Sequence, residues 1–127
     1  MSELDNGPAL FRHLHDLYGP RVRVRKQTLG GWSVDVSVRD DLLVAADVEQ
    51  EAHQVRVYLG RFTFEGLTPP QYEDVLNALS RSDFALRHRR LTGTLELRVQ
   101  ASSGEQTAYA SVGAEGLEAW EQAALDT

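Results

Sequence analysis

The sequence has no cysteine, which excludes both a disulfide framework and a thiolate metal site. No apolar run approaches the roughly 18 residues that a membrane-spanning helix needs. The first residues, Met1–Pro8, are polar and acidic and lack the basic and apolar regions of a signal peptide. These absences predict a cytoplasmic protein that does not enter a membrane.

Basic residues are also in the minority, with 13 against 19 acidic residues and a net charge of −6. Proteins that bind nucleic acid usually carry the opposite balance, so direct binding of nucleic acid is not expected. The few basic residues gather in two clusters: Arg21, Arg23, Arg25 and Lys26, then Arg81, Arg87, His88, Arg89 and Arg90. The length of 127 residues and the 42% hydrophobic content fit one domain over residues 1–127.

Three segments are predicted to be helices. The first, Pro8–Tyr18, has apolar residues at helical spacing and ends at Gly19-Pro20. Thr68 is expected to cap the second, which starts at Pro69-Pro70 and ends near Ser82. The third is a short acidic helix over Ala114–Leu125.

Strand-like alternation of apolar and polar residues follows the first helix. The clearest runs contain Trp32–Val38, Leu42–Val48 and Val55–Leu59, and Gly60-Arg61 is interpreted as a bulge before Phe62 and Phe64. Two later strands, Thr94–Ala101 and Gln106–Val112, are predicted, whereas Phe84–Leu91 is ambiguous. The expected architecture is α+β, an antiparallel β-sheet with helices packed on one side in the order α-β-β-β(-β)-α-β-β-α.

The register of the first strands can be tested by counting residues. A short loop after Val38 pairs Val36 with Val44, which keeps the apolar side chains on one face. A tight turn at Gly30-Gly31 instead places Arg25 opposite Val36. The segment Arg21–Leu29 is therefore expected to be a poorly paired or differently registered edge.

No group of residues predicts catalysis, a metal site or a cofactor. His13 and His15 are two apart on a helix and point to nearly opposite sides, so they are interpreted as solvated histidines. The adjacent Asp40 and Asp41 suggest paired carboxylates, but turn formation explains them more simply. The sequence contains no glycine-rich phosphate-binding motif. We expect that the protein is not an enzyme.

The order of elements resembles that of the YbjN and type III secretion chaperone-like families. The matching segments are ALFRHLHDLYG, GWSVDVSVRDDLLVAADVEQEAHQVRVYLGRF, PPQYEDVLNALSRS and GTLELRVQASSGEQTAYASVG. The basic run Arg21–Leu29 and the RHRR run at residues 87–90 depart from that pattern. The resemblance implies a type III secretion chaperone-like fold and a homodimer that binds other proteins.

The leading hypothesis is therefore a non-enzymatic chaperone-like or adaptor module that acts as a homodimer on a partner protein. The alternative is a small acidic inhibitor, such as a toxin-neutralising immunity protein. The candidate partner-binding residues are Arg23, Arg25, Trp32, Arg87, Arg89 and Arg90. A loosely held edge at Arg21–Lys26 would accept an extended segment of the partner by strand addition. Alternatively, these arginines only keep that edge soluble, and Trp32 belongs to the core.

Overall fold

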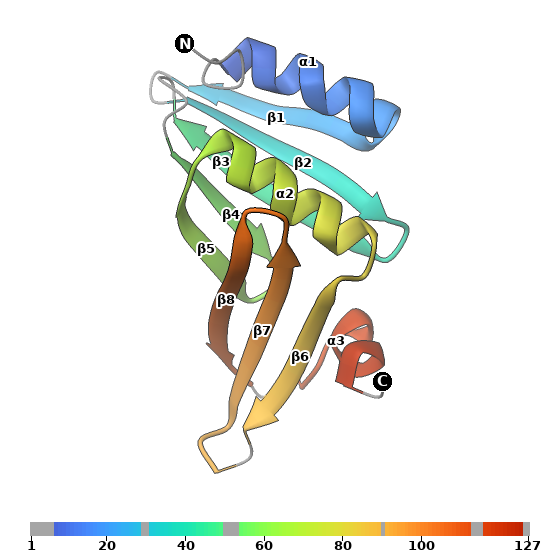
Figure 1. The fold of residues 1–127 in the computed structure, drawn as a ribbon, viewed down its shortest axis with the longest axis vertical. Coiled ribbons are helices and arrows are strands. Elements are labelled where there is room, and N and C mark those ends of the chain that lie inside the picture. Colours follow the sequence, from blue (N-terminus) through green and yellow to red (C-terminus); the bar gives the residue numbers. More distant parts are fainter. Residues whose placement is uncertain (1–6, 29–30, 50–53, 90, 113–115, 126–127) are drawn as a thin grey trace.

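The computed structural model describes residues 7–28, 31–49, 54–89, 91–112 and 116–125. Its α+β architecture confirms the predicted class (Figure 1). One antiparallel sheet, sheet A, contains in spatial order β1 (Val22–Thr28), β2 (Gly31–Arg39), β3 (Leu42–Glu49), β4 (Val55–Leu59) and β5 (Phe62–Leu67). A second, sheet B, contains β6 (Phe84–Arg89), β7 (Thr94–Ala101) and β8 (Gly104–Ser111). The helices are α1 (Gly7–Tyr18), the 3-10 turn η2 (Gly19–Arg21), α2 (Pro69–Ser80) and α3 (Ala119–Leu125).

The strands thus form two sheets where the sequence predicted one, and the first meander has five strands. The extra strand arises at Gly60-Arg61, where the expected bulge is wrong. Leu59 pairs with Phe62, so these two residues form a tight turn and β5 runs back along β4. Gly60 has a φ of +56°, which glycine adopts without steric cost. A two-residue turn explains why the apolar positions change from odd to even numbers.

The segment expected to be loosely held is a paired strand. Val22 lies opposite Val36 and Val24 opposite Val34, and the register shifts between Val24 and Lys26. A bulge at Arg25 therefore lets the valines of β1 lie opposite the valines of β2. Counting residues from a Gly30-Gly31 turn had placed arginines opposite those valines. Of the two alternatives, the different register is right and poor pairing is wrong. The predicted pairing of Val36 with Val44 is confirmed.

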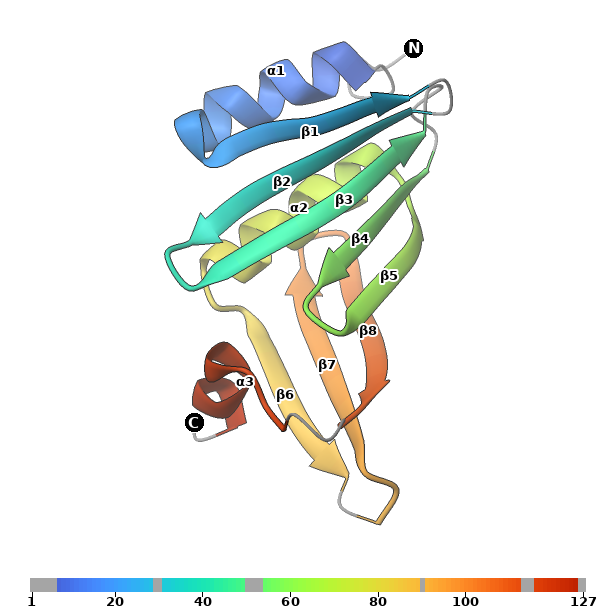
Figure 2. The ribbon, with the colours of Figure 1, turned by 180° about the vertical axis from the view of Figure 1, so that it is seen from behind.

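Both α1 and α2 cover the same face of sheet A, and none of the described helices lies over the opposite face (Figures 1 and 2). The alternating apolar residues of β2 to β5 point toward these helices and are buried. Helix α2 also contacts β7, so it belongs to the cores under both sheets. The predicted cap of α2 is confirmed: Gln71 N donates to Thr68 Oγ1 at 3.3 Å, and Thr68 N donates to Gln71 Oε1 at 2.9 Å.

The ambiguous segment after α2 forms β6, an edge strand of sheet B. Leu86, Leu97 and Ala108 pair across the three strands and form part of the buried face. Helix α3 places Trp120 between Phe62 of sheet A and Phe84 of sheet B, with ring centroids 6.1 and 6.2 Å apart. These edge-on contacts connect the C-terminal helix to both sheets.

One side chain of the core is incompletely satisfied. Tyr72 on α2 is fully buried, and its Oη has no hydrogen-bond partner among the described residues. Burial raises the pKa of this phenol. We expect Tyr72→Phe to raise the free energy of unfolding by about 1 kcal/mol, because it removes an unpaired hydroxyl. Urea denaturation would measure this, with Tyr109→Phe at an exposed position as the unchanged control. A loss of stability would contradict the prediction.

Candidate functional site

The residues singled out in the sequence do not form one surface. Arg23 is exposed and lies opposite Asp35 in the register, on the open face of sheet A. Trp32 points to the helix-covered face, where its ring packs edge-on against Phe11 at 5.5 Å. Arg87 and Arg89 lie on β6, in the other sheet (Figure 1). The side chain of Arg25 and all of Arg90 fall outside the described part of the chain.

The open face of sheet A carries an exposed apolar side chain near the β2–β3 turn, which the sequence did not single out. Leu43 on β3 is 57% exposed and lies near Ala45 and Tyr58. These residues line one side of a groove of about 640 Å³, and Glu118 and Trp120 line the other side. The signal was available, because Leu43 occupies a position of β3 that alternation assigns to the polar face.

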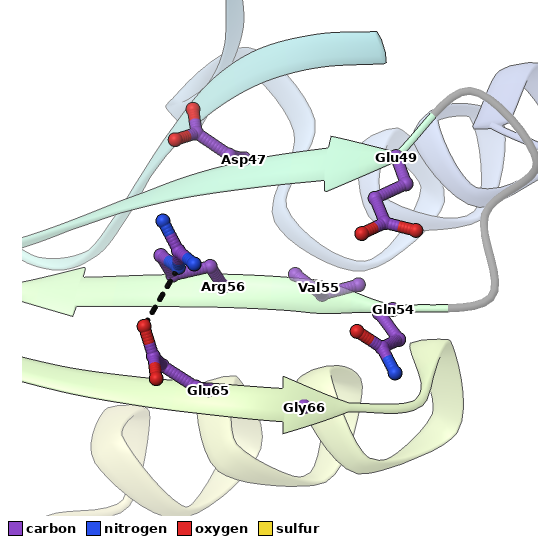
Figure 3. Close-up of a pocket in the computed structure, with 7 residues that line it drawn as sticks. All are labelled: Asp47, Glu49, Gln54, Val55, Arg56, Glu65 and Gly66. Atoms are coloured by element: carbon purple, nitrogen blue, oxygen red, sulfur yellow. Dashed lines mark ion pairs between the residues drawn. The ribbon is translucent and has the colours of Figure 1, made fainter. Parts of the chain in front are cut away.

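A second hollow on sheet A is acidic (Figure 3). Its volume is about 490 Å³, and its lining is Asp47, Glu49, Gln54, Val55, Arg56, Glu65 and Gly66. Arg56 Nε lies 3.0 Å from Glu65 Oε1, an exposed pair that contributes at most about 1 kcal/mol. Tyr58 Oη donates to Asp47 at 3.1 Å. With three carboxylates against one guanidinium, this surface favours a cationic partner.

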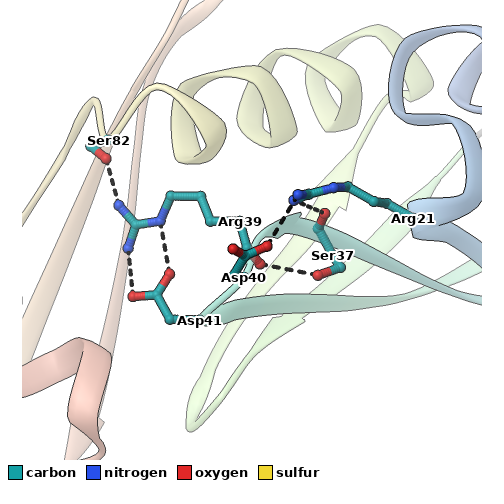
Figure 4. Close-up of polar contacts among 6 residues, drawn as sticks. All are labelled: Arg21, Ser37, Arg39, Asp40, Asp41 and Ser82. Atoms are coloured by element: carbon teal, nitrogen blue, oxygen red, sulfur yellow. Dashed lines mark hydrogen bonds and ion pairs between the residues drawn. The ribbon is translucent and has the colours of Figure 1, made fainter.

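Two arginines, Arg21 and Arg39, hold the turn between β2 and β3 (Figure 4). The polar contacts around this turn involve Arg21, Ser37, Arg39, Asp40, Asp41 and Ser82. Arg39 donates to Asp41 at 3.1 and 3.2 Å and also to Ser82 Oγ, beyond the end of α2. Arg21 Nη2 donates to Asp40 at 3.1 Å. The two aspartates form the turn, as predicted, and each has an arginine partner.

The outer face of sheet B carries a cluster of arginines around a covered carboxylate. Glu96 on β7 is only 1% exposed, because Arg89 and Arg98 lie over it. Arg89 Nη2 donates to Glu96 Oε2 at 2.7 Å, and Arg98 Nε donates to Glu96 Oε1. Arg87 lies opposite Glu96 but forms no ion pair with the described residues. It therefore presents an uncompensated charge beside the cluster.

Hydrogen bonding, first from Arg89 and then from Arg98, lowers the pKa of Glu96. A carboxyl group with a lowered pKa in the folded state stabilises the fold above its unfolded-state pKa. That contribution is lost as the pH falls through the folded-state value. The contribution of the Glu96 ion pairs to stability is therefore fully present at neutral pH.

A second covered ion pair joins the β4–β5 turn to α3. Glu121 is fully buried and accepts from Arg61 Nε and Nη2, both at 2.8 Å. Arg61 also donates to the backbone oxygens of Ser111 at 3.2 Å and Gly116 at 2.7 Å. This pair holds the fold together and leaves no charge for a ligand.

The described residues contain no group of three or more His, Cys, Asp or Glu side chains placed to hold a metal ion. None of the helices in this part of the chain combines the length and apolar composition needed to cross a bilayer. The candidate site thus consists of three surfaces: the apolar groove, the acidic hollow and the arginine cluster beside β6. No family model, no curated protein and no solved structure matches this chain.

Proposed function

We propose that this chain is a non-enzymatic protein-binding module of the chaperone or adaptor kind, working as a cytoplasmic homodimer on a partner protein. The observation that carries the proposal is the face of sheet A over which no described helix lies, with exposed Leu43 near the β2–β3 turn and Tyr58 beside it. Apolar side chains on a rigid, otherwise polar sheet are typical of protein contact surfaces. The type III secretion chaperone-like resemblance supports the same function.

The homodimer is assigned to this face and not to the basic strand β6. The face carries both signs of charge, with Arg23 near Asp35 and Arg56 near Glu65. A two-fold axis can then place these charges against opposite charges of the second copy, beside the apolar side chain of Leu43. Leu43 would be covered in such a dimer.

Light scattering at micromolar concentration is expected to give twice the monomer mass of 14.2 kDa. Leu43→Glu is expected to give the monomer mass, because it replaces the exposed apolar side chain of the proposed interface with a charge. Leu17→Glu on α1, with a similar exposure, is the control and is expected to leave the dimer intact. A wild-type protein that has only the monomer mass would exclude the homodimer.

A small acidic inhibitor is the second candidate, and the acidic hollow favours it. Asp47, Glu49 and Glu65 would cover a basic enzyme site, as an acidic immunity protein does. Asp47→Lys together with Glu65→Lys would then abolish binding of the partner. The adaptor proposal places Glu65 in the homodimer face, so there the same double variant is expected to change the mass measured by light scattering, whereas in the inhibitor proposal that mass stays as in the wild type.

Site-specific photo-crosslinking in the source cell tests whether the chain binds proteins at all. A photoreactive residue is placed at Leu43, at Ala85 on β6, or at exposed Arg12 on α1 as control. Discrete adducts with another protein are expected from at least one of the first two positions and none from Arg12. If neither position gives a protein adduct, the proposed function is wrong.

A further inference from the structure

We infer that the outer edge of β6, from Leu86 to Arg89, is a strand-addition site for an extended acidic segment of a partner protein. This inference rests on the proposed function and names the surface and the chemistry that the partner presents. It moves the predicted strand addition from β1, at Arg21–Lys26, to the other basic cluster of the chain.

The backbone of β6 has one unpaired side. Gln100 N donates to Asp83 O at 2.8 Å, and these residues occupy the position before the Phe84–Val99 pair. In an antiparallel ladder the bonded pairs alternate, so the backbone groups of Leu86 and His88 point away from β7. No hydrogen bond from another described element reaches Leu86 or His88.

Helix α3 sets the upper limit of the open edge. Trp120 packs against Phe84, and α3 lies beside the first half of β6 (Figures 1 and 2). The end of β6 projects beyond α3 toward the β6–β7 turn, while residues 116–118, which lead into α3, run beside the middle of the strand. The open stretch is therefore short, and it is defined by the backbone groups of Leu86 and His88, to which no other described element hydrogen-bonds.

The side chains on this edge select an acidic strand. Arg87 and Arg89 are exposed on one face of β6, and Arg87 lacks an ion-pair partner among the described residues. Acidic residues at alternate positions of an added strand would lie opposite these two arginines. Glu96 already orients the guanidinium of Arg89, so less side-chain freedom is lost on binding.

The same arginines argue against a second copy as the occupant. If two β6 strands paired about a two-fold axis at His88, Arg87 of each copy would lie opposite Arg89 of the other. Like charges directly opposite each other destabilise a strand pair. The edge thus excludes self-association while it accepts an acidic strand.

The end of the edge provides an apolar contact. Leu91, in the β6–β7 turn, is 104% exposed, and with Arg87, His88, Arg89 and Thr92 it lines a hollow of about 410 Å³. A partner segment that alternates acidic and apolar residues would place its acids at the arginines and an apolar residue near Leu91. This pattern favours a protein strand over nucleic acid, since no Phe, Tyr or Trp lines the hollow and His88 is the one ring in its lining on which a base would stack.

The test uses eight-residue capped peptides titrated into the full ¹⁵N-labelled chain. A peptide that alternates glutamate and valine is expected to bind about tenfold more tightly than one that alternates lysine and valine. In the predicted register, the valines bond to Leu86 and His88. N-methylation of the valine amides should therefore weaken binding about tenfold, whereas N-methylation of the glutamate amides should not. The amide protons of Leu86 and His88 should become protected from exchange.

Arg87→Gln should weaken binding of the glutamate–valine peptide several-fold, and it removes the charge without placing a second carboxylate opposite Glu96. Arg12→Gln makes the same charge change on α1 and should have no effect. Equal binding of both N-methylated peptides would overturn the proposal. So would shifts confined to sheet A, tighter binding of a 12-nucleotide single strand, or protection of Leu86 and His88 without peptide. Shifts on sheet A alone would contradict this site and leave the proposed function standing.

Discussion

Replacing Arg61 with methionine is expected to lower the free energy of unfolding by about 3–5 kcal/mol. The substitution leaves the carboxylate of Glu121 fully buried with no cation beside it. It also removes the donors to the backbone oxygens of Ser111 and Gly116. Urea denaturation followed by circular dichroism would measure the loss.

The double variant Arg61→Met/Glu121→Leu provides the control, because it removes both charges together. Replacing a buried pair by apolar residues costs much less than breaking it, so the double variant should recover most of the lost stability. Part of the loss should remain, since Glu121 Oε1 also accepts from Glu118 N at 2.8 Å at the start of α3. A double variant as unstable as Arg61→Met would show that the unpaired carboxylate of Glu121 is not the cause of the loss.

Leu76→Ala on α2 is expected to cost about 2–5 kcal/mol. Leu76 is fully buried, and α2 contacts strands of both sheets. The cavity would therefore weaken the two sheets at once. We expect a single cooperative unfolding transition in the wild type and in the variant, at a lower denaturant concentration in the variant.

Leu91→Ala makes the same chemical change at a fully exposed position and should shift stability by less than about 0.5 kcal/mol. Hydrogen exchange of β2 amides and of β7 amides would follow sheets A and B separately. Two separated transitions would show that sheets A and B unfold independently and that residues 1–127 are not one cooperative domain.

The sequence predicted the elements whose signals are local. The capping box at Thr68 and the alternation in β2 and β3 depend on neighbouring residues, and both appear as expected. The Gly60-Arg61 turn was misread because a bulge and a tight turn both change the parity of the apolar positions. A turn also requires that β5 pair back onto β4, which periodicity within one strand does not report.

The candidate surfaces were harder to predict, because they depend on contacts between distant residues. Arg61 and Glu121 are 60 positions apart, so nothing near either residue identified the other. Glu96 lies between Leu95 and Leu97 and was indistinguishable from a solvated glutamate until Arg89 and Arg98 were placed over it. The position of Arg87 stands out only in the structure, which shows that Arg89, two residues further along β6, pairs with Glu96 while Arg87 has no ion pair with a described residue.

The meander of sheet A has a consequence for synthesis on the ribosome. Each of its strands pairs with the strand made just before it, so the whole sheet closes through short loops of low entropic cost. Helix α2 follows at once and can cover the apolar face as soon as residue 80 has emerged. Arg61, however, must wait until Glu121 leaves the exit tunnel. We therefore expect the nascent chain to form sheet A early. The ion pair between Arg61 and Glu121 forms only after α3 has been made.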